Sequence, residues 1–205
     1  ALGAWLVHYS TDYVFNGLGD VPWQEGDPTA PLNVYGATKL AGEQAIRRDC
    51  TRHLIFRTSW VYAARGNNFA KTMLRLAQDR SELGVINDQT GAPTGAELIA
   101  DVTALALRQV LAQPQLSGIY HLAAGGTTTW YDYAAFVFAQ ARQSGIELAL
   151  EQLNPIPSSS YPTPAQRPTN SRLNCHKLEA TFGLQLPHWQ QGVARMLNEI
   201  MEQKQ

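Results

Sequence analysis

A tyrosine and a lysine four residues apart, Tyr35 and Lys39 in the segment YGATK, are the two side chains best suited to chemistry. Positions i and i+4 share one face of a helix, so their Cβ atoms lie within about 6 Å of each other. An ordinary tyrosine has a pKa near 10, and a neighbouring positive charge favours its phenolate form. The spacing therefore predicts a tyrosine that works as a general acid or base near neutral pH.

A second polar cluster, STDYVF, starts at Ser10, at the end of a short apolar run. Thr11 supplies a hydroxyl that could reach the same substrate oxygen as the tyrosine. Ligands of open α/β sheets bind at the carboxyl ends of strands, and we expect Thr11, Asp12 and Trp60 to lie there. The alternative, in which Tyr35 only packs its ring and Lys39 is only solvated, is weakened by this nearby cluster.

Short apolar segments typical of strands alternate with segments of helical periodicity along most of the chain, and this alternation is typical of a parallel α/β sheet. We expect strands near residues 5–10, 53–62, 85–86 and 117–124. We expect helices of about four turns from residue 33 and over residues 68–80, 97–112, 131–143 and 190–202. Residues 16–32 are rich in glycine and proline and predict a surface loop. Residues 154–172 hold five prolines and predict an irregular linker or a substrate-facing loop.

The composition excludes several classes of function. The chain has 205 residues, 44% of them hydrophobic and 16% charged, with a formal net charge of −1. This balance offers no basic face for a nucleic acid, and no apolar stretch is long enough to cross a membrane. Cys50 and Cys175 lie far apart without metal-ligand spacing, so we expect reduced thiols in a cytoplasmic protein.

Five motifs together resemble the extended short-chain dehydrogenase/reductase superfamily, and within it the dTDP-4-dehydrorhamnose reductases: STDYVF, PLNVYGATKLAGE, RTSWVY, NNFAKTML and INDQTGAPTGAELIAD. The resemblance runs over nearly the whole chain. It implies an enzyme that reduces the C4 keto group of dTDP-4-dehydro-L-rhamnose to form dTDP-L-rhamnose for cell-surface polysaccharide. It also implies NADPH or NADH as the hydride donor and a cytoplasmic homodimer.

The resemblance assigns a catalytic set and a cofactor contact. Thr11, Tyr35 and Lys39 would form the catalytic triad, with Tyr35 protonating the C4 oxygen as hydride arrives. Tyr35, Lys39 and Tyr9 would contact the cofactor, and Lys39 would bind the nicotinamide ribose.

It also assigns substrate contacts. Thr11 and Asp12 would contact the sugar, and Trp60 would pack against the sugar ring, although a tryptophan that ends a buried strand is more often part of the core. Arg167 or Arg172, in the segment RPTNSRLN, could pair with the diphosphate. For each arginine, a plain surface role is an equal alternative.

Two acidic residues, Glu97 and Glu199, resemble positions that hold Mg²⁺ at a dimer contact in some members of the family. A glutamate at a helix amino terminus is more often a partner of the helix dipole. A further difference concerns position 13: related dehydratases place Asp-Glu after the threonine, whereas Asp12 is followed here by Tyr13. Without a second carboxylate, reduction is the better interpretation.

No GxxGxxG segment, the turn that binds a dinucleotide pyrophosphate, occurs in the sequence. We therefore expect an incomplete Rossmann-type fold without its amino-terminal strands, inactive by itself. Residues 1–150 would form the carboxyl-terminal part of the Rossmann-type domain with interleaved substrate segments. Residues 151–205 would form a substrate-binding loop and a terminal helix. The alternatives are a non-catalytic regulatory or binding module, and another nucleotide-sugar reductase or epimerase of the superfamily.

Overall fold

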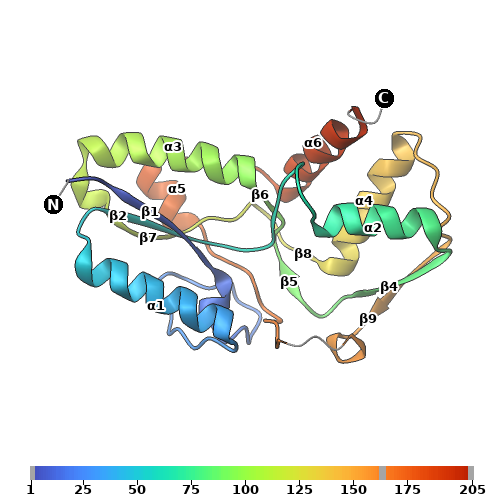
Figure 1. Ribbon diagram of the computed structural model, residues 1–205, viewed down its shortest axis with the longest axis horizontal. Coiled ribbons are helices and arrows are strands. Elements are labelled where there is room, and N and C mark those ends of the chain that lie inside the picture. Colours follow the sequence, from blue (N-terminus) through green and yellow to red (C-terminus); the bar gives the residue numbers. More distant parts are fainter. Residues whose placement is uncertain (1–2, 162–164, 203–205) are drawn as a thin grey trace.

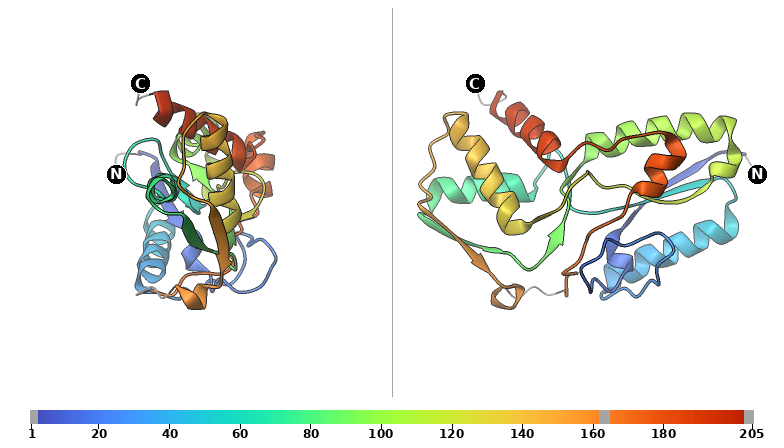
Figure 2. Two further views of the ribbon diagram at one scale, coloured as in Figure 1. Left: turned by 90° about the vertical axis from the view of Figure 1, so that its right-hand side faces the viewer. Right: turned by 180° about the vertical axis from the view of Figure 1, so that it is seen from behind.

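The computed structural model of the protein describes residues 3–161 and 165–202, which form two lobes side by side (Figure 1). One lobe holds α1, α3 and α5 around a sheet, and the other holds α2, α4 and α6 beside a pair of strands. The view from behind shows the same division (Figure 2). The segments that connect the lobes cross between them several times.

The sheet of the first lobe contains three parallel strands, in the order β1 (Leu6–Thr11), β2 (His53–Thr58) and β7 (Gly118–His121). Helix α1 (Val34–Asp49) covers one face of this sheet, and α3 (Ala96–Ala112) and α5 (His176–Phe182) cover the other (Figure 1). Thr11 pairs in register with Thr58, so the carboxyl ends of β1 and β2 lie level. The prediction of a parallel α/β fold of Rossmann type is confirmed.

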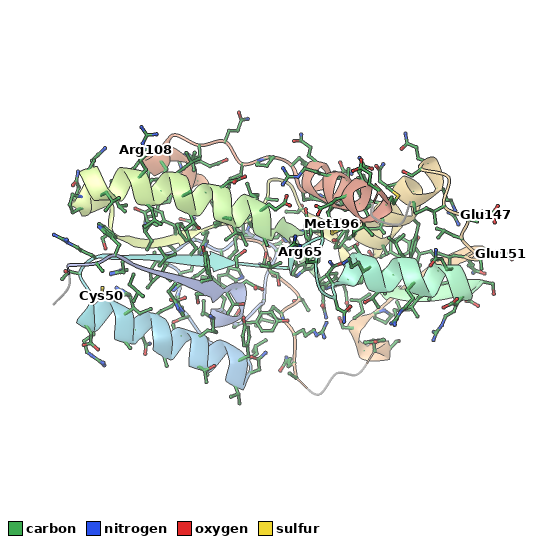
Figure 3. The ribbon with its side chains drawn as sticks, turned by 45° about the horizontal axis from the view of Figure 1, so that its top comes forward. Cys50, Arg65, Arg108, Glu147, Glu151 and Met196 are labelled. Carbon is green, nitrogen blue, oxygen red and sulfur yellow. The ribbon has the colours of Figure 1, made fainter. Side chains whose placement is uncertain are left out.

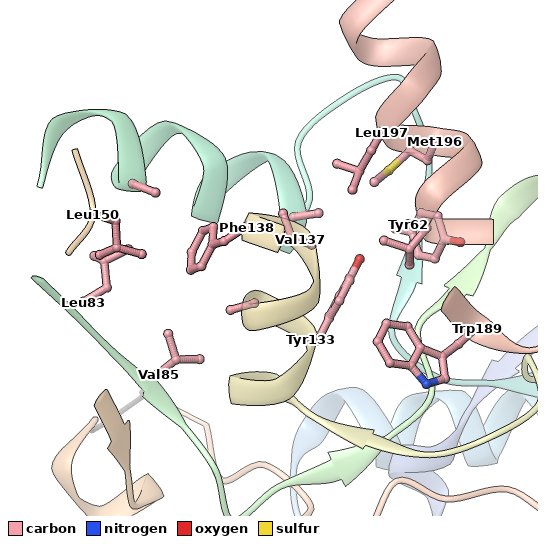
Figure 4. Close-up of a cluster of buried hydrophobic side chains, with 14 of the residues drawn as sticks. Tyr62, Leu83, Val85, Tyr133, Val137, Phe138, Leu150, Trp189, Met196 and Leu197 are labelled. Atoms are coloured by element: carbon pink, nitrogen blue, oxygen red, sulfur yellow. The ribbon is translucent and has the colours of Figure 1, made fainter. Parts of the chain in front are cut away.

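The second lobe packs three helices against a parallel strand pair. The helices are α2 (Phe69–Asp79), α4 (Trp130–Gln143) and α6 (Trp189–Glu202), and the strands are β4 (Glu82–Ile86) and β9 (Gln152–Ile156). Tyr133 is 1% exposed at the centre of this core, and its ring meets Trp189 edge-on at 5.7 Å between centroids. The same hydrophobic cluster (Figure 4) also contains Leu83, Val85, Val137, Phe138, Leu150, Met196 and Leu197.

Short strands line the boundary between the lobes. β3 (Val61–Tyr62) pairs with β6 (Thr94–Gly95), and β5 (Thr90–Gly91) pairs with β8 (Thr128–Thr129). Three single-turn 3₁₀ helices complete the described elements: η1 (Asp12–Val14), η2 (Pro114–Leu116) and η3 (Ser158–Ser160).

Two local predictions were wrong, and one short helix was missed. The strand expected over residues 53–62 is broken at Trp60, whose φ of 48° turns the chain out of the sheet. The segment expected to be irregular from residue 154 begins with the last residues of β9, because Pro155 is accommodated in a two-stranded pair with an open edge. Helix α5 was not expected, since it spans only seven residues. The division at residue 150 stays a prediction, and the pairing of β4 with β9 crosses it.

A buried ion pair fixes α1 to the sheet. Arg57 donates from Nε and Nη2 to the two carboxylate oxygens of Glu43, at 2.9 and 2.7 Å. Both side chains are almost fully buried. Since burying two charges is costly unless their geometry is good, this bidentate pair holds α1 in one position on β2.

Many charged side chains point outward, as Arg108, Glu147 and Glu151 do in Figure 3. Cys50 and Cys175 are free thiols, and burial raises the pKa of Cys175 to about 12. Within residues 3–161 and 165–202, no helix combines the length and the apolar character that crossing a membrane requires.

Candidate active site

Thr11 and Asp12 stand together where β1 ends and η1 begins. The Thr11 Oγ1 accepts a hydrogen bond from the backbone N–H of Tyr13 at 3.2 Å and donates to Asp12 Oδ1 at 3.1 Å. Asp12 is 2% exposed. Burial raises the pKa of Asp12 to about 7, and the hydroxyls of Ser171 and Thr11 oppose this rise in part. The carboxyl therefore changes its charge near neutral pH.

Tyr35 and Lys39 lie in the first turns of α1, as predicted. Asn33 caps this helix by accepting from the backbone N–H of Gly36 at 2.9 Å. The Tyr35 side chain is 53% exposed, and its ring meets that of Tyr13 edge-on, 5.6 Å away. The Lys39 ammonium donates to the backbone carbonyl of Tyr9. This contact joins α1 to the middle of β1.

The catalytic set predicted from the sequence is brought to one region. Helix α1 packs against η1, which directly follows Thr11. Tyr13, in η1, is the residue through which the two segments meet, because its ring contacts that of Tyr35. Tyr35 is accessible, whereas Thr11 is buried.

The backbone and the side chain of Tyr9 contact different helices. Its carbonyl accepts from Lys39 on the side of α1, while its phenol lies 3.0 Å from the Thr103 hydroxyl on α3. Its ring stacks on that of Phe56 at 6.3 Å between centroids and stays 42% exposed. The Tyr9 side chain therefore lies on the opposite face of the sheet from Lys39.

Arg167 and Arg172 have different surroundings. Arg167 lines a hollow of about 620 Å³ together with Tyr13 and Tyr35. It also lines a second hollow of about 510 Å³ together with Trp130. The guanidinium of Arg172 instead donates to the backbone carbonyl of Asp20 and so holds the loop over residues 16–32. Only Arg167 of these two faces the candidate site.

Trp60 follows β2, two residues after the partner of Thr11 in the sheet. Its ring stacks on that of Trp130 with centroids 3.7 Å apart and planes 15° from parallel. Sequence reasoning missed Trp130, Ser171 and the contact of Tyr13 with Tyr35. No local pattern marks them, because each depends on contact between segments far apart in the chain.

Glu97 and Glu199, the proposed magnesium ligands, belong to no group of three metal-ligating side chains in the part of the chain that the structure describes. Glu97 forms an ion pair with Arg195, and both side chains are more than half exposed. Among the residues that the structure describes, no group of three His, Cys, Asp or Glu side chains is arranged to hold a metal ion. The structure thus gives the Mg²⁺ prediction no support.

A threonine at the end of a parallel strand and a YxxxK pair on the following helix define the short-chain dehydrogenase/reductase class, built on a Rossmann-type sheet. The family pattern described as the RmlD substrate binding domain matches residues 1–202. The chain belongs to this family, that of the dTDP-4-dehydrorhamnose reductases.

Individual relatives agree with this assignment. The dTDP-4-dehydrorhamnose reductase of Escherichia coli K12 is 67% identical over 199 residues, which are 97% of this chain and 67% of the relative. The crystal structure of the reductase from Clostridium acetobutylicum matches with a TM-score of 0.86 and 34% identity, over 97% of this chain and 67% of that one. The Bacillus anthracis reductase, solved in complex with NADP, matches with a TM-score of 0.82 and 36% identity, over 96% and 66%. This chain thus spans about two thirds of the length of these relatives.

Proposed function

We propose that this chain carries the proton-donating and sugar-binding residues of a reductase that converts dTDP-4-dehydro-L-rhamnose to dTDP-L-rhamnose with NADPH or NADH. The observation that carries the proposal is the exposed Tyr35 phenol, one helical turn from Lys39 and in contact with the segment that follows Thr11. A phenol on a rigid helix, open to a hollow, is placed to exchange a proton with a ligand.

A nicotinamide cofactor, when bound, supplies hydride to the C4 carbon of the sugar. Tyr35 and Lys39 fit such a cofactor, since the phenol is accessible and the lysine already bridges α1 and β1. As negative charge develops on the C4 oxygen, the Tyr35 phenol donates its proton to that oxygen. The nearby positive charge of Lys39 stabilises the phenolate that is left behind.

Thr11 can donate a hydrogen bond to the substrate oxygen only when its hydroxyl proton is not already donated to Asp12. In the ionised state of Asp12, the Thr11 hydroxyl donates to the carboxylate. When Asp12 is protonated, the carboxyl donates to Thr11 Oγ1 instead, and the threonine hydroxyl is free to donate to the substrate oxygen. A carboxyl with its pKa raised to about 7 reaches this state near neutral pH.

The hollows beside Tyr35 indicate which residues would contact the diphosphate and the sugar. Arg167, between the two hollows, is the better candidate of the two arginines for the diphosphate, because a guanidinium binds phosphate oxygens bidentately. Trp60 would contact the sugar through the edge of its partly buried indole, since Gly91 and Trp130 cover the two ring faces. A homodimer and a cytoplasmic location, which the family implies, stay predictions that sedimentation and cell fractionation would test.

The test is turnover of defined nucleotide sugars by the active reductase, followed through the absorbance of NADPH. We expect oxidation of NADPH with dTDP-4-dehydro-L-rhamnose, and a loss of about a hundredfold or more when Arg167→Ala is assayed at low substrate concentration. Arg172→Ala is the matched control, and it should change turnover far less. No turnover of this sugar, with turnover of another nucleotide sugar, would replace the proposed substrate.

A further inference from the structure

The backbone of Trp60 is in a conformation that tryptophan rarely adopts. Among the described residues it is the only one other than glycine with a positive φ, at 48°. A bulky residue in this region carries strain of about 1 kcal/mol or more. Something in the surrounding structure must therefore hold the residue in place.

One side of the Trp60 ring is held by Gly91, in β5. A β-carbon added to Gly91 would lie 2.7 Å from Cε2 of the indole, closer than non-bonded carbon atoms approach. The ring thus lies directly on the backbone of β5. Only the absence of a side chain at position 91 gives it this room.

The other side of the ring is held by Trp130, the first residue of α4, in the stack at 3.7 Å. Trp130 is itself anchored, because its indole N–H donates to Gln89 Oε1 at 3.1 Å. Gln89 is 5% exposed and donates in turn to the Ser158 hydroxyl at 2.9 Å. Asp88 accepts from the backbone N–H of Ser158 at 2.9 Å. A continuous set of contacts thus runs from the second lobe to Trp60.

We infer that Trp130 is a positioning residue for the sugar: it holds the Trp60 indole in its strained position, and the Gln89–Ser158 hydrogen bonds hold Trp130. This inference rests on the proposed contact of Trp60 with the sugar ring. Trp130 also lines the hollow that meets the Tyr35 hollow at Arg167. The packing of the second lobe therefore sets the position of the Trp60 ring, whose uncovered edge is the part that can reach the sugar.

A double-mutant cycle in the active reductase separates positioning from general stability. Trp130→Leu should raise KM for the sugar nucleotide about tenfold, with kcat changed less than threefold. In the Trp60→Leu background, the same change should alter KM less than twofold, because the ring that it positions is gone. An equal rise in both backgrounds would overturn the inference.

Gly91→Ala tests the same ring from its other face and leaves the second-lobe core untouched. Its new methyl group must displace the Trp60 indole, so KM should rise by a similar factor. A KM unchanged by Gly91→Ala would contradict a tightly held ring. This variant keeps the inference open to contradiction even if Trp130→Leu fails to fold.

Circular dichroism gives a readout independent of activity. Two stacked indoles couple their transitions, so the wild type should show a paired positive and negative band that Trp60→Leu and Trp130→Leu both abolish. Trp5→Phe, which removes an indole from the other lobe, is the control and should keep the bands. If Trp5→Phe alone removes them, the stack is not their source and the inference loses this support.

The outcome also separates the two proposals. If Trp60→Leu leaves KM unchanged, the sugar contact in the proposed function is wrong and the inference falls with it. If Trp60→Leu raises KM but the cycle is additive, only the positioning role of Trp130 is overturned.

Discussion

The carbonyl oxygen of Tyr13 occupies the space that a β-carbon on Gly36 would need. This contact lets the first turn of α1 approach η1 closely, directly beside Tyr35. Position 36 requires glycine because a larger residue would collide with the Tyr13 carbonyl, and not because of its own φ, which is outside the left-handed region. The distance between the Thr11 segment and the Tyr35 phenol depends on it.

Gly36→Ala should force α1 away from η1. We expect a loss of about 1–3 kcal/mol in the free energy of unfolding, which is typical of overpacking, and a fall in kcat of tenfold or more. Gly42→Ala is the matched control on the same helix, because the nearest atom to its new β-carbon is His8 Nε2 at 3.7 Å. That variant should gain roughly 0.5–1 kcal/mol, as glycine-to-alanine changes in helices do. Equal effects at both positions in urea unfolding would contradict the role of Gly36.

The Glu43–Arg57 pair should be essential to the fold. Glu43→Gln leaves the Arg57 charge buried without its partner, and breaking such pairs costs about 3–5 kcal/mol. Urea unfolding of the chain measures this loss. Arg48→Ala, which breaks the exposed pair of Arg48 with Asp49, is the control and should leave the unfolding midpoint unchanged. A Glu43→Gln variant as stable as the wild type would show that α1 is held by other contacts.

The fold class and the placement of Tyr35 and Lys39 on one helix could be predicted, because they depend on patterns between residues close together in the sequence. The period of α1 and its cap at Asn33 lie within a few residues of one another, and so does the Tyr35–Lys39 spacing. The places of the YxxxK pair on a helix and of Thr11 at a strand end could thus be predicted without knowing any packing, while their catalytic roles stay a prediction.

Other features could not be predicted, because they depend on packing between distant segments. The strained turn at Trp60 is stable only against Gly91 and Trp130. The strand β9 contains Pro155, a residue that local patterns exclude from strands, and it exists because β4 lies beside it. The same limit applies to Arg172, whose partner is a backbone carbonyl in the loop over residues 16–32.

Asp12 should make the stability of the protein depend on pH. Its pKa is about 7 in the folded chain and near 3.8 when unfolded, so between these values the folded state binds the extra proton. Stability is then greatest below pH 4 for this group and falls as pH rises to 7, by up to roughly 4 kcal/mol at about 1.4 kcal/mol per pKa unit. Asp12→Asn, which mimics the neutral carboxyl, should remove this term.

The measurement is urea unfolding of both proteins at pH 5 and pH 8. The difference in unfolding free energy, wild type minus Asp12→Asn, should become more negative at pH 8. An equal difference in unfolding free energy at pH 5 and pH 8 would show that Asp12 has the same pKa in the folded and unfolded states.

The proton-donating role of Tyr35 is the central claim, and Tyr35→Phe tests it most directly. The variant keeps the ring that packs against Tyr13 and removes only the phenolic hydroxyl group. Single-turnover reduction of dTDP-4-dehydro-L-rhamnose by the active reductase, with NADPH in excess, should slow by about a hundredfold or more, as removal of a general acid predicts. Tyr120→Phe, which removes a phenol that donates to the Leu116 carbonyl away from the site, should keep the rate. A Tyr35→Phe variant that reduces the sugar at the wild-type rate would contradict the account.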